Sequence, residues 1–145
     1  MPDAIHAYLD VSQTAGAAFF HRGLSGPVVM LNLLRFRAVA DYAADPQLAP
    51  AVPMSGAAAF DRYVAHTLPF LERSGGRLLG QYDGGPWLIG PEGELWDRAM
   101  LVEQSSVAAF MAFANDPAYR TGLGHRTAAL ADSRLLPLVE RPIGP

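Results

Sequence analysis

The sequence predicts an α+β fold in which an antiparallel sheet carries its helices on one face. The order strand, helix, strand occurs twice along the 145 residues, and two such units make the β-α-β-β-α-β pattern of ferredoxin-like folds. The first strand is apolar on both faces, so we expect it to be covered on both sides. A second copy of the chain is the simplest second cover, which predicts a dimeric α+β barrel with sheet packed against sheet.

The length and composition suit a single domain spanning residues 1–145. Half of the residues are hydrophobic and 17% are charged, so the chain can bury a large core without disulfides or metals. The net charge of −3, with no basic run, argues against nucleic acid and membrane surfaces as partners. The absence of cysteine and lysine excludes thiolate and Schiff-base chemistry. The first residues carry no secretion signal, so we expect a cytoplasmic location.

The chain begins with an expected N-terminal helical extension, residues 1–25. Ser12 is a suitable N-cap for a short helix that Gly23 would end. The run VVMLNLLRF, residues 28–36, is the first predicted strand. Its alternating positions place Val28, Met30, Leu34 and Phe36 on one face and Val29, Leu31 and Leu33 on the other.

A long loop and a long helix are expected next. Residues 38–55 are rich in Ala, Pro and Asp and should form an irregular loop, with at most one helical turn near residues 41–44. Long loops in compact domains are often lids. Ser55 can cap the following helix, and Pro69 should kink or divide it. The apolar face of this helix consists of Phe60, Tyr63, Val64, Thr67 and Leu71.

Short strands and turns follow the helix, which should end at Ser74-Gly75-Gly76. RLLGQY, residues 77–82, reads as a strand, and residues 83–86 as a turn. WLIG, residues 87–90, reads as a returning strand before a second turn at residues 91–94.

The last third of the chain predicts the second strand-helix-strand unit. RAMLVEQ, residues 98–104, is the strand, and Ser105 or Ser106 caps a helix whose core positions are Val107, Phe110, Met111 and Ala114. Asp116-Pro117 should end that helix and start another. The closing strand is RLLPLVE, residues 134–140. The second helix should bury Tyr119, Leu123, Thr127 and Leu130.

Asn32, Tyr119 and Arg126 are the first candidates for a binding pocket. The side chain of Asn32 lies on the face of an otherwise apolar strand, where an amide must find partners. A pocket would supply them, and so would a neighbouring strand, a loop or an ordered water. Arg126 falls at the margin of the buried helix face, two turns after Tyr119. A guanidinium there can bind a carboxylate through two hydrogen bonds, from a ligand or from an acid of the same chain.

Arg35 and two aromatic side chains complete the candidate pocket. Arg35 points to the sheet face opposite Asn32, where it could bind a substrate or form an ion pair with Asp97. Aromatic side chains at strand and helix spacings usually belong to a core, but they can also line a cavity. Those in question are Tyr63, Tyr82, Trp87 and Trp96, of which Tyr63 and Trp87 are candidates for the pocket.

His125 and Asp132 are weaker candidates. Imidazole titrates nearest to neutral pH, which makes His125 the obvious general base. Helical phase, counted from Leu123, turns both His125 and Asp132 away from the core, where they could pair with each other, or Asp132 could help to close a turn. The histidines have no metal-ligand spacing, so we expect neither a metal site nor a cofactor.

Four segments between Gly26 and Leu138 are distinctive: GPVVMLNLLRFR, SGAAAFDRY, WDRAMLVEQSSVAAF, and DPAY followed by HRTAALADSRLLPL. Together they resemble the domain-of-unknown-function thirteen-thirty family. The resemblance implies the dimeric α+β barrel superfamily and therefore a homodimer. The family has no agreed activity and lends no catalytic residue. Its superfamily relatives include cofactorless monooxygenases, haem-degrading enzymes and muconolactone-type isomerases, a breadth which means that the fold does not give the function.

Three hypotheses for function follow. The first is a cofactor-independent enzyme, monooxygenase-like or isomerase-like, that holds a small apolar or aromatic acid between sheet and helices while the long loop closes over it. The second is a non-catalytic module that binds a small molecule or another protein. The third is a haem-binding or haem-degrading protein that uses Asn32, a tryptophan and His125, and the outward phase of His125 disfavours it.

Overall fold

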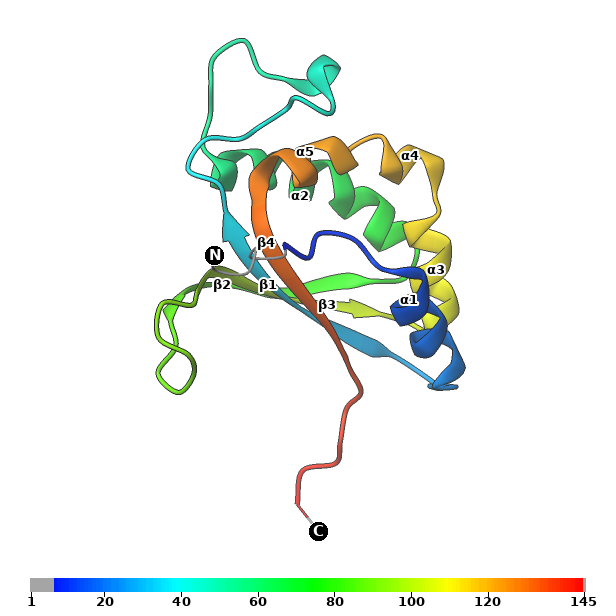
Figure 1. Ribbon diagram of the computed structural model, residues 1–145. Coiled ribbons are helices and arrows are strands. Elements are labelled where there is room, and N and C mark those ends of the chain that lie inside the picture. The colour runs from blue at the N-terminus through cyan, green and yellow to red at the C-terminus, as the bar shows by residue number, and fades with distance from the viewer. Residues whose placement is uncertain (1–6, 145) are drawn as a thin grey trace.

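The computed structural model describes residues 7–144 and contains a four-stranded antiparallel sheet with helices on one face (Figure 1). The strands are β1 (Val28–Phe36), β2 (Arg77–Pro86), β3 (Leu95–Gln104) and β4 (Leu130–Leu138). Their spatial order is β2-β3-β1-β4, and every neighbouring pair is antiparallel. The predicted ferredoxin-like α+β fold is confirmed.

The helices are α1 (Gln13–His21), α2 (Gly56–Arg73), α3 (Val107–Ala114), α4 (Pro117–Arg120) and α5 (Leu123–Ala129). Four of the five helices in the described residues begin at predicted caps, and α5 begins after Gly122 without a side-chain cap. The hydroxyl groups of Ser12, Ser55 and Ser106 each accept the backbone N–H three residues later, at the start of α1, α2 and α3. Asp116 caps α4 in the same way, with Pro117 at the first position. No helix in the described part of the chain combines the length and hydropathy needed to cross a membrane.

The hairpin between β2 and β3 differs from the prediction, because WLIG is not a strand. The two strands pair as far as Pro86 and Leu95, so the residues between them form the hairpin loop. Leu88 and Ile89 at its end are 98% and 92% exposed. This segment was predicted as a strand because its four apolar residues stand between two predicted turns. In the β2–β3 register no residue of the sheet pairs with them.

The predicted last helix is divided, and its predicted buried face is correct only in part: Tyr119 and Leu130 are buried, whereas Leu123 is half-buried. α4 ends before Gly122, and the helical phase starts again at Leu123. α5 therefore buries Gly124, Ala128 and Ala129, and Thr127 is exposed. The chain then enters β4 at Leu130, four residues earlier than predicted.

Three smaller expectations also changed. Pro69 does not divide α2, which continues for 18 residues with this proline inside it. Met111 of α3 is 38% exposed and lies outside the core. The helical turn of the long loop is a 3₁₀ turn at Pro46–Leu48, after the predicted position.

The long loop, residues 38–55, packs on the domain through both backbone and side chains. The N–H of Ala40 donates to the Met54 carbonyl, and the N–H of Asp41 donates to the Ala128 carbonyl, both at 2.9 Å. Tyr42 is only 8% exposed and belongs to the main core cluster. Figure 1 shows the rest of the loop standing above the helical layer.

The core between sheet and helices is divided into two clusters along β1. Leu34, near the end of the strand, packs with Phe60 and Leu130. Val28 and Met30, near its start, pack with Val107 of α3. The opposite face of β1 carries Val29, Leu31 and Leu33, which are only half-buried because every helix lies on the other side (Figure 1).

A close backbone approach at Gly56 leads to a testable prediction. A Cβ at this position would lie 2.3 Å from the Arg37 carbonyl oxygen and 2.6 Å from the Ala129 carbonyl oxygen. We expect Gly56→Ala to lower the free energy of unfolding by about 1–3 kcal/mol, because rigid backbone must move to admit the methyl group. Gly85→Ala is the matched control, since a Cβ there meets nothing within 4 Å. Urea unfolding that ranked the two variants equally would contradict this packing constraint.

Candidate functional site

Asn32 lies where the core is interrupted. It shares the helix-facing side of β1 with Met30 and Leu34, which belong to different clusters. Its amide nitrogen donates to the Met30 carbonyl at 3.3 Å, and this is its one side-chain hydrogen bond within residues 7–144. Asn32 is half-buried although its strand pairs on both sides. The side-chain amide of Asn32 can therefore form further hydrogen bonds within the layer between sheet and helices.

Two tyrosines from different helices meet in the same layer. The hydroxyl groups of Tyr63 on α2 and Tyr119 on α4 are 2.7 Å apart and form a hydrogen bond. Tyr119 is 7% exposed, and burial is the main reason that its pKa is raised, with Tyr63 adding to the effect. Tyr119 is therefore protonated at neutral pH. In a pair of hydroxyl groups one proton serves the mutual bond, and the other remains available to a ligand.

Arg126 of α5 is half-buried and binds only neutral groups. Its guanidinium donates to the Leu9 carbonyl oxygen and, at 3.4 Å, to the Ser133 hydroxyl oxygen. The ion pairs within the described residues join other side chains, so the acid that could have neutralised Arg126 is absent there. The charge of Arg126 is close enough to Tyr119 to oppose the rise of the tyrosine pKa. Arg126 and the tyrosine pair thus belong to one electrostatic site.

The polar residues after α5 hold the N-terminal segment in place. The carboxylate of Asp132 accepts the Tyr8 N–H at 2.9 Å, and the Ser133 hydroxyl donates to the Tyr8 carbonyl oxygen. The guanidinium of Arg134 lies 4.7 Å from the centroid of the Tyr8 ring. Figure 1 shows this segment crossing between the helices and β4 on its way to α1. The segment therefore covers one side of the layer that contains Arg126.

Asp132 does not point to solvent, contrary to the expectation from helical phase. It lies in β4 and is 6% exposed, because the helix ends before it. Burial by itself raises the pKa of its carboxyl group. Hydrogen bonds from Tyr8 N–H, Arg134 and Ser133 N–H outweigh that effect and hold the pKa below its usual value. Asp132 therefore acts as the anionic anchor of the N-terminal segment and does not pair with His125.

His125 is also not solvated as predicted. It is half-buried beneath the long loop, where its Nδ1 and the Tyr42 hydroxyl form a 2.8 Å hydrogen bond. Burial lowers its pKa, and the nearby charges of Arg62 and His66 lower it further, while Asp45 opposes them. The imidazole is therefore mostly neutral at pH 7.

Arg35 and Trp87 lie outside this site. Arg35 donates twice to the Leu95 carbonyl oxygen, at 3.0 and 2.8 Å, and stacks over Trp96. Its expected partner Asp97 instead accepts the Phe36 N–H at 2.8 Å. Trp87 is 41% exposed in the hairpin loop and donates its indole N–H to Glu94. The other four leading candidates lie on β1, α2, α4 and α5, and a hydrogen bond joins two of them, Tyr63 and Tyr119; the set is Asn32, Tyr63, Tyr119 and Arg126.

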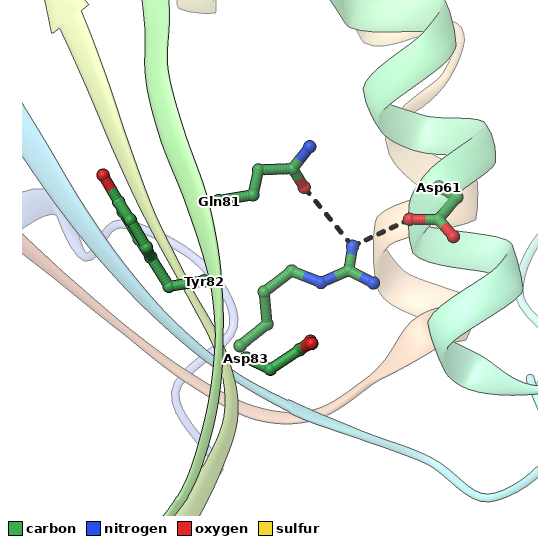
Figure 2. A pocket seen from close by; sticks show the side chains of 5 residues that line it. Asp61, Gln81, Tyr82 and Asp83 are labelled. Carbon is green, nitrogen blue, oxygen red and sulfur yellow. Dashed lines mark hydrogen bonds and ion pairs between the residues drawn. The ribbon is translucent and has the colours of Figure 1, made fainter.

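A pocket of about 230 Å³ lies between α2 and β2, where the sequence interpretation proposed none (Figure 2). Its lining is Asp61, Gln81, Tyr82, Asp83 and Arg98. The sequence signal that could have indicated this pocket was Arg98. It lies on the helix-facing side of β3 together with Met100, as a charged residue on a mostly apolar face. In the described part of the chain, no group of His, Asp and Glu side chains could hold a metal ion.

The Asp132 anchor predicts a pH dependence. Because the pKa of its carboxyl group is lower in the folded chain, its contribution to stability is present above the unfolded value of about 3.9 and is lost as the pH falls through the folded value. We expect Asp132→Asn to cost about 1–3 kcal/mol at pH 7 and much less near pH 2. Urea unfolding at both pH values measures the difference. Asp10→Asn, an exposed change in the same segment, is the control, and a cost for Asp132→Asn that did not change with pH would contradict the assignment.

Comparison with known proteins identifies relatives of the whole chain. A family model described as "Domain of unknown function (DUF1330)" matches residues 51–140. The RPA0582 protein of unknown function from Rhodopseudomonas palustris is 36% identical, with a TM-score of 0.81 over 97% of this chain and 100% of that one. The structure of methylated RPA0582 protein gives 35% identity and a TM-score of 0.85 at the same coverage.

A more distant structure resembles the chain in fold alone. An uncharacterized NIPSNAP domain protein from Burkholderia xenovorans has a TM-score of 0.50 at 15% identity, over 81% of this chain and 98% of that one. No curated protein matches the chain. The relatives thus share the architecture and bring no activity with them.

Proposed function

We propose that this chain, which belongs to the DUF1330 family, is a homodimeric protein that binds a small apolar or aromatic carboxylic acid between its sheet and its helices. One observation carries the proposal. The half-buried guanidinium of Arg126 has no carboxylate partner within residues 7–144, and its hydrogen bonds go to the Leu9 carbonyl and the Ser133 hydroxyl. Half-buried charges in proteins are usually paired, so a ligand carboxylate would complete this site.

Replacement of the Leu9 carbonyl by a ligand group at Arg126 would favour an acid over a neutral ligand. A carboxylate that replaced the Leu9 carbonyl would turn a neutral hydrogen bond into a charge-assisted one, which is roughly twice as strong. The replacement requires Leu9 to move away from Arg126, either with Tyr8 still anchored or with the release of its hydrogen bonds to Asp132 and Ser133. The acid would then enter from the side of β4.

The aromatic rings around the tyrosine pair support an aromatic or apolar body for the ligand. The rings of Tyr119 and Phe113 lie 4.3 Å apart between their centroids, and those of Tyr63 and Phe60 lie 5.2 Å apart. The tyrosine hydroxyl pair can donate one proton to the ligand. Asn32 faces the same layer and has an unused carbonyl oxygen for a second polar contact within the described residues. These are few polar groups in an apolar setting, as in most small-molecule sites.

The uncovered face of the sheet supports the homodimer. Val29, Leu31 and Leu33 of β1 are only half-buried there, and Leu136 of β4 is 54% exposed. Large contiguous apolar surfaces are uncommon on monomers. A second copy packed sheet to sheet would cover this face on both chains at once.

Turnover of the bound acid is a second candidate function, and His125 is the observation that favours it. A lowered pKa keeps its imidazole in the basic form at neutral pH, as a general base requires. His125 precedes Arg126 on α5, beneath the long loop that contacts it through Tyr42. Cofactor-independent proton abstraction from the acid, as in an isomerisation, would suit this arrangement. Binding without turnover remains the simpler proposal, since Arg126 alone carries it.

Substitution of Arg126 tests the acid site. We expect Arg126→Gln to weaken binding of benzoate-like and phenylacetate-like acids by about 10–100-fold, the equivalent of one charged hydrogen-bonding partner. Tyr119→Phe should weaken it less, because only one hydroxyl is lost. Isothermal titration of the full chain with a panel of such acids measures both. Arg37→Gln removes the same charge from an exposed position and serves as the control. Acids that bound all three variants equally well would refute the site.

A charge on the open sheet face tests the homodimer. We expect the unchanged chain to have the molar mass of two copies in multi-angle light scattering. Leu31→Asp should give a monomer with an unchanged circular dichroism spectrum, because an unpaired carboxylate in an apolar interface is costly. Val52→Asp introduces the same charge at a residue that is 73% exposed in the long loop, and it should remain dimeric. A monomeric unchanged chain would disprove the sheet-to-sheet arrangement.

A further inference from the structure

We infer that the pocket between α2 and β2 is a second binding site and that it takes a small zwitterion, a molecule with one carboxylate and one ammonium group such as a free α-amino acid. Figure 2 shows the pocket between α2 and β2, and none of its lining residues belongs to the site around Arg126. Its volume of about 230 Å³ lies below the usual range for drug-sized ligands. A small molecule matches this volume.

Arg98 is the fixed cation of this pocket. Its guanidinium lies 4.9 Å from the ring centroid of Phe36 and 6.0 Å from that of Phe60, and its side chain is 16% exposed. Two aromatic faces beside a planar guanidinium limit its rotation and stabilise its charge. The pocket therefore presents a preorganised donor, which lowers the entropy cost of binding a carboxylate.

The present partner of Arg98 is easily exchanged. Asp61 of α2 lies 2.7 Å from the guanidinium, but its side chain is 63% exposed. Ion pairs with so exposed a member contribute little to stability, since water competes for both charges. Asp61 can thus turn to solvent while a ligand carboxylate takes its place on Arg98.

Asp83 supplies the opposite charge for the ammonium group. It stands directly across from Arg98 in the β2–β3 register, and its carboxylate has no hydrogen-bond or ion-pair partner within residues 7–144. Gln81, two residues earlier, directs its side chain to the same side of β2, while Tyr82 points the other way (Figure 2). The Gln81 amide oxygen is only weakly bound by Arg98, at 3.5 Å. Asp83 and Gln81 therefore offer acceptors beside a guanidinium donor.

The mixture of charges selects the ligand class. A simple carboxylic acid would meet Arg98 but would be repelled by Asp61 and Asp83. A simple amine would meet Asp83 but would be repelled by Arg98. A zwitterion whose two charges are a few ångströms apart satisfies both groups, which is the geometry of an α-amino acid.

Titration of the full chain with the common free L-amino acids tests the inference. We expect at least one to produce saturable shifts in the amide resonances of Gln81, Asp83 and Arg98 in nuclear magnetic resonance spectra. Its amide derivative, which lacks the carboxylate, and its N-acetyl derivative, which lacks the ammonium, should each bind at least tenfold more weakly. No saturable shift with any amino acid would overturn the inference, as would equal binding of either derivative.

Substitutions at two exposed acids sharpen the test. Asp83→Asn should weaken amino-acid binding at least tenfold, whereas Asp61→Asn should leave it unchanged or tighten it, because Asp61 competes with the ligand for Arg98. Glu92→Gln removes a similar exposed charge from the hairpin loop and is the matched control. Arg126→Gln should leave this binding unchanged, so the two sites can fail independently. If Asp83→Asn bound as tightly as Glu92→Gln, the assigned role of Asp83 would be wrong.

Discussion

β1 carries apolar side chains on two faces, while the helices of one chain cover only one of them. The strand is central in the sheet, paired with β3 on one side and β4 on the other, so its backbone is satisfied within the chain. Its helix-facing side holds both core clusters, and its other side holds Leu31 and its neighbours at half exposure. Both the layer proposed to hold a ligand and the proposed dimer interface thus depend on one strand, since each is formed by one of its faces.

The helix-facing side of β1 also explains why a polar site can exist in a domain this apolar. Asn32 lies between Met30 and Leu34, which belong to different clusters of fully buried residues, so a polar side chain interrupts the buried face of the strand there. A continuous apolar core would have excluded an arginine, because a charge without a partner is costly in a dry interior. The N-terminal segment resolves the problem within one chain by giving Arg126 a carbonyl group. Because the Leu9 carbonyl is neutral, the positive charge of Arg126 can still gain from a carboxylate partner.

The elements with local signals were predictable and those set by distant contacts were not. Serine caps and the Asp116-Pro117 start act within one helical turn, so each appears in the sequence where it appears in the structure. The prediction for the last helix was wrong in part because a new helix begins after Gly122 with a different helical phase. The prediction of a WLIG strand was wrong because β3 pairs with residues 77–86, which precede that segment. Among the candidate residues, Tyr119 and Arg126 were proposed from spacing, and the structure buries the first and half-buries the second. The role of Asp132 was missed because its partner Tyr8 is 124 positions away.

The two proposed sites differ in whether the arginine already has a carboxylate partner, and this difference follows from the position of each arginine in the fold. Arg98 lies on β3 beside the edge strand β2, and Asp61 of α2 already pairs with its charge, which is why the proposal assigns it a ligand that brings both charges. Arg126 lies behind the N-terminal segment. Moving a carboxylate from water to this half-buried place costs free energy, and only the charge of Arg126 can offset that cost. A simple acid therefore suits the inner site and a zwitterion the outer one. The two proposals therefore assign different classes of small molecule to the same kind of side chain, because the number of carboxylates beside each guanidinium is different.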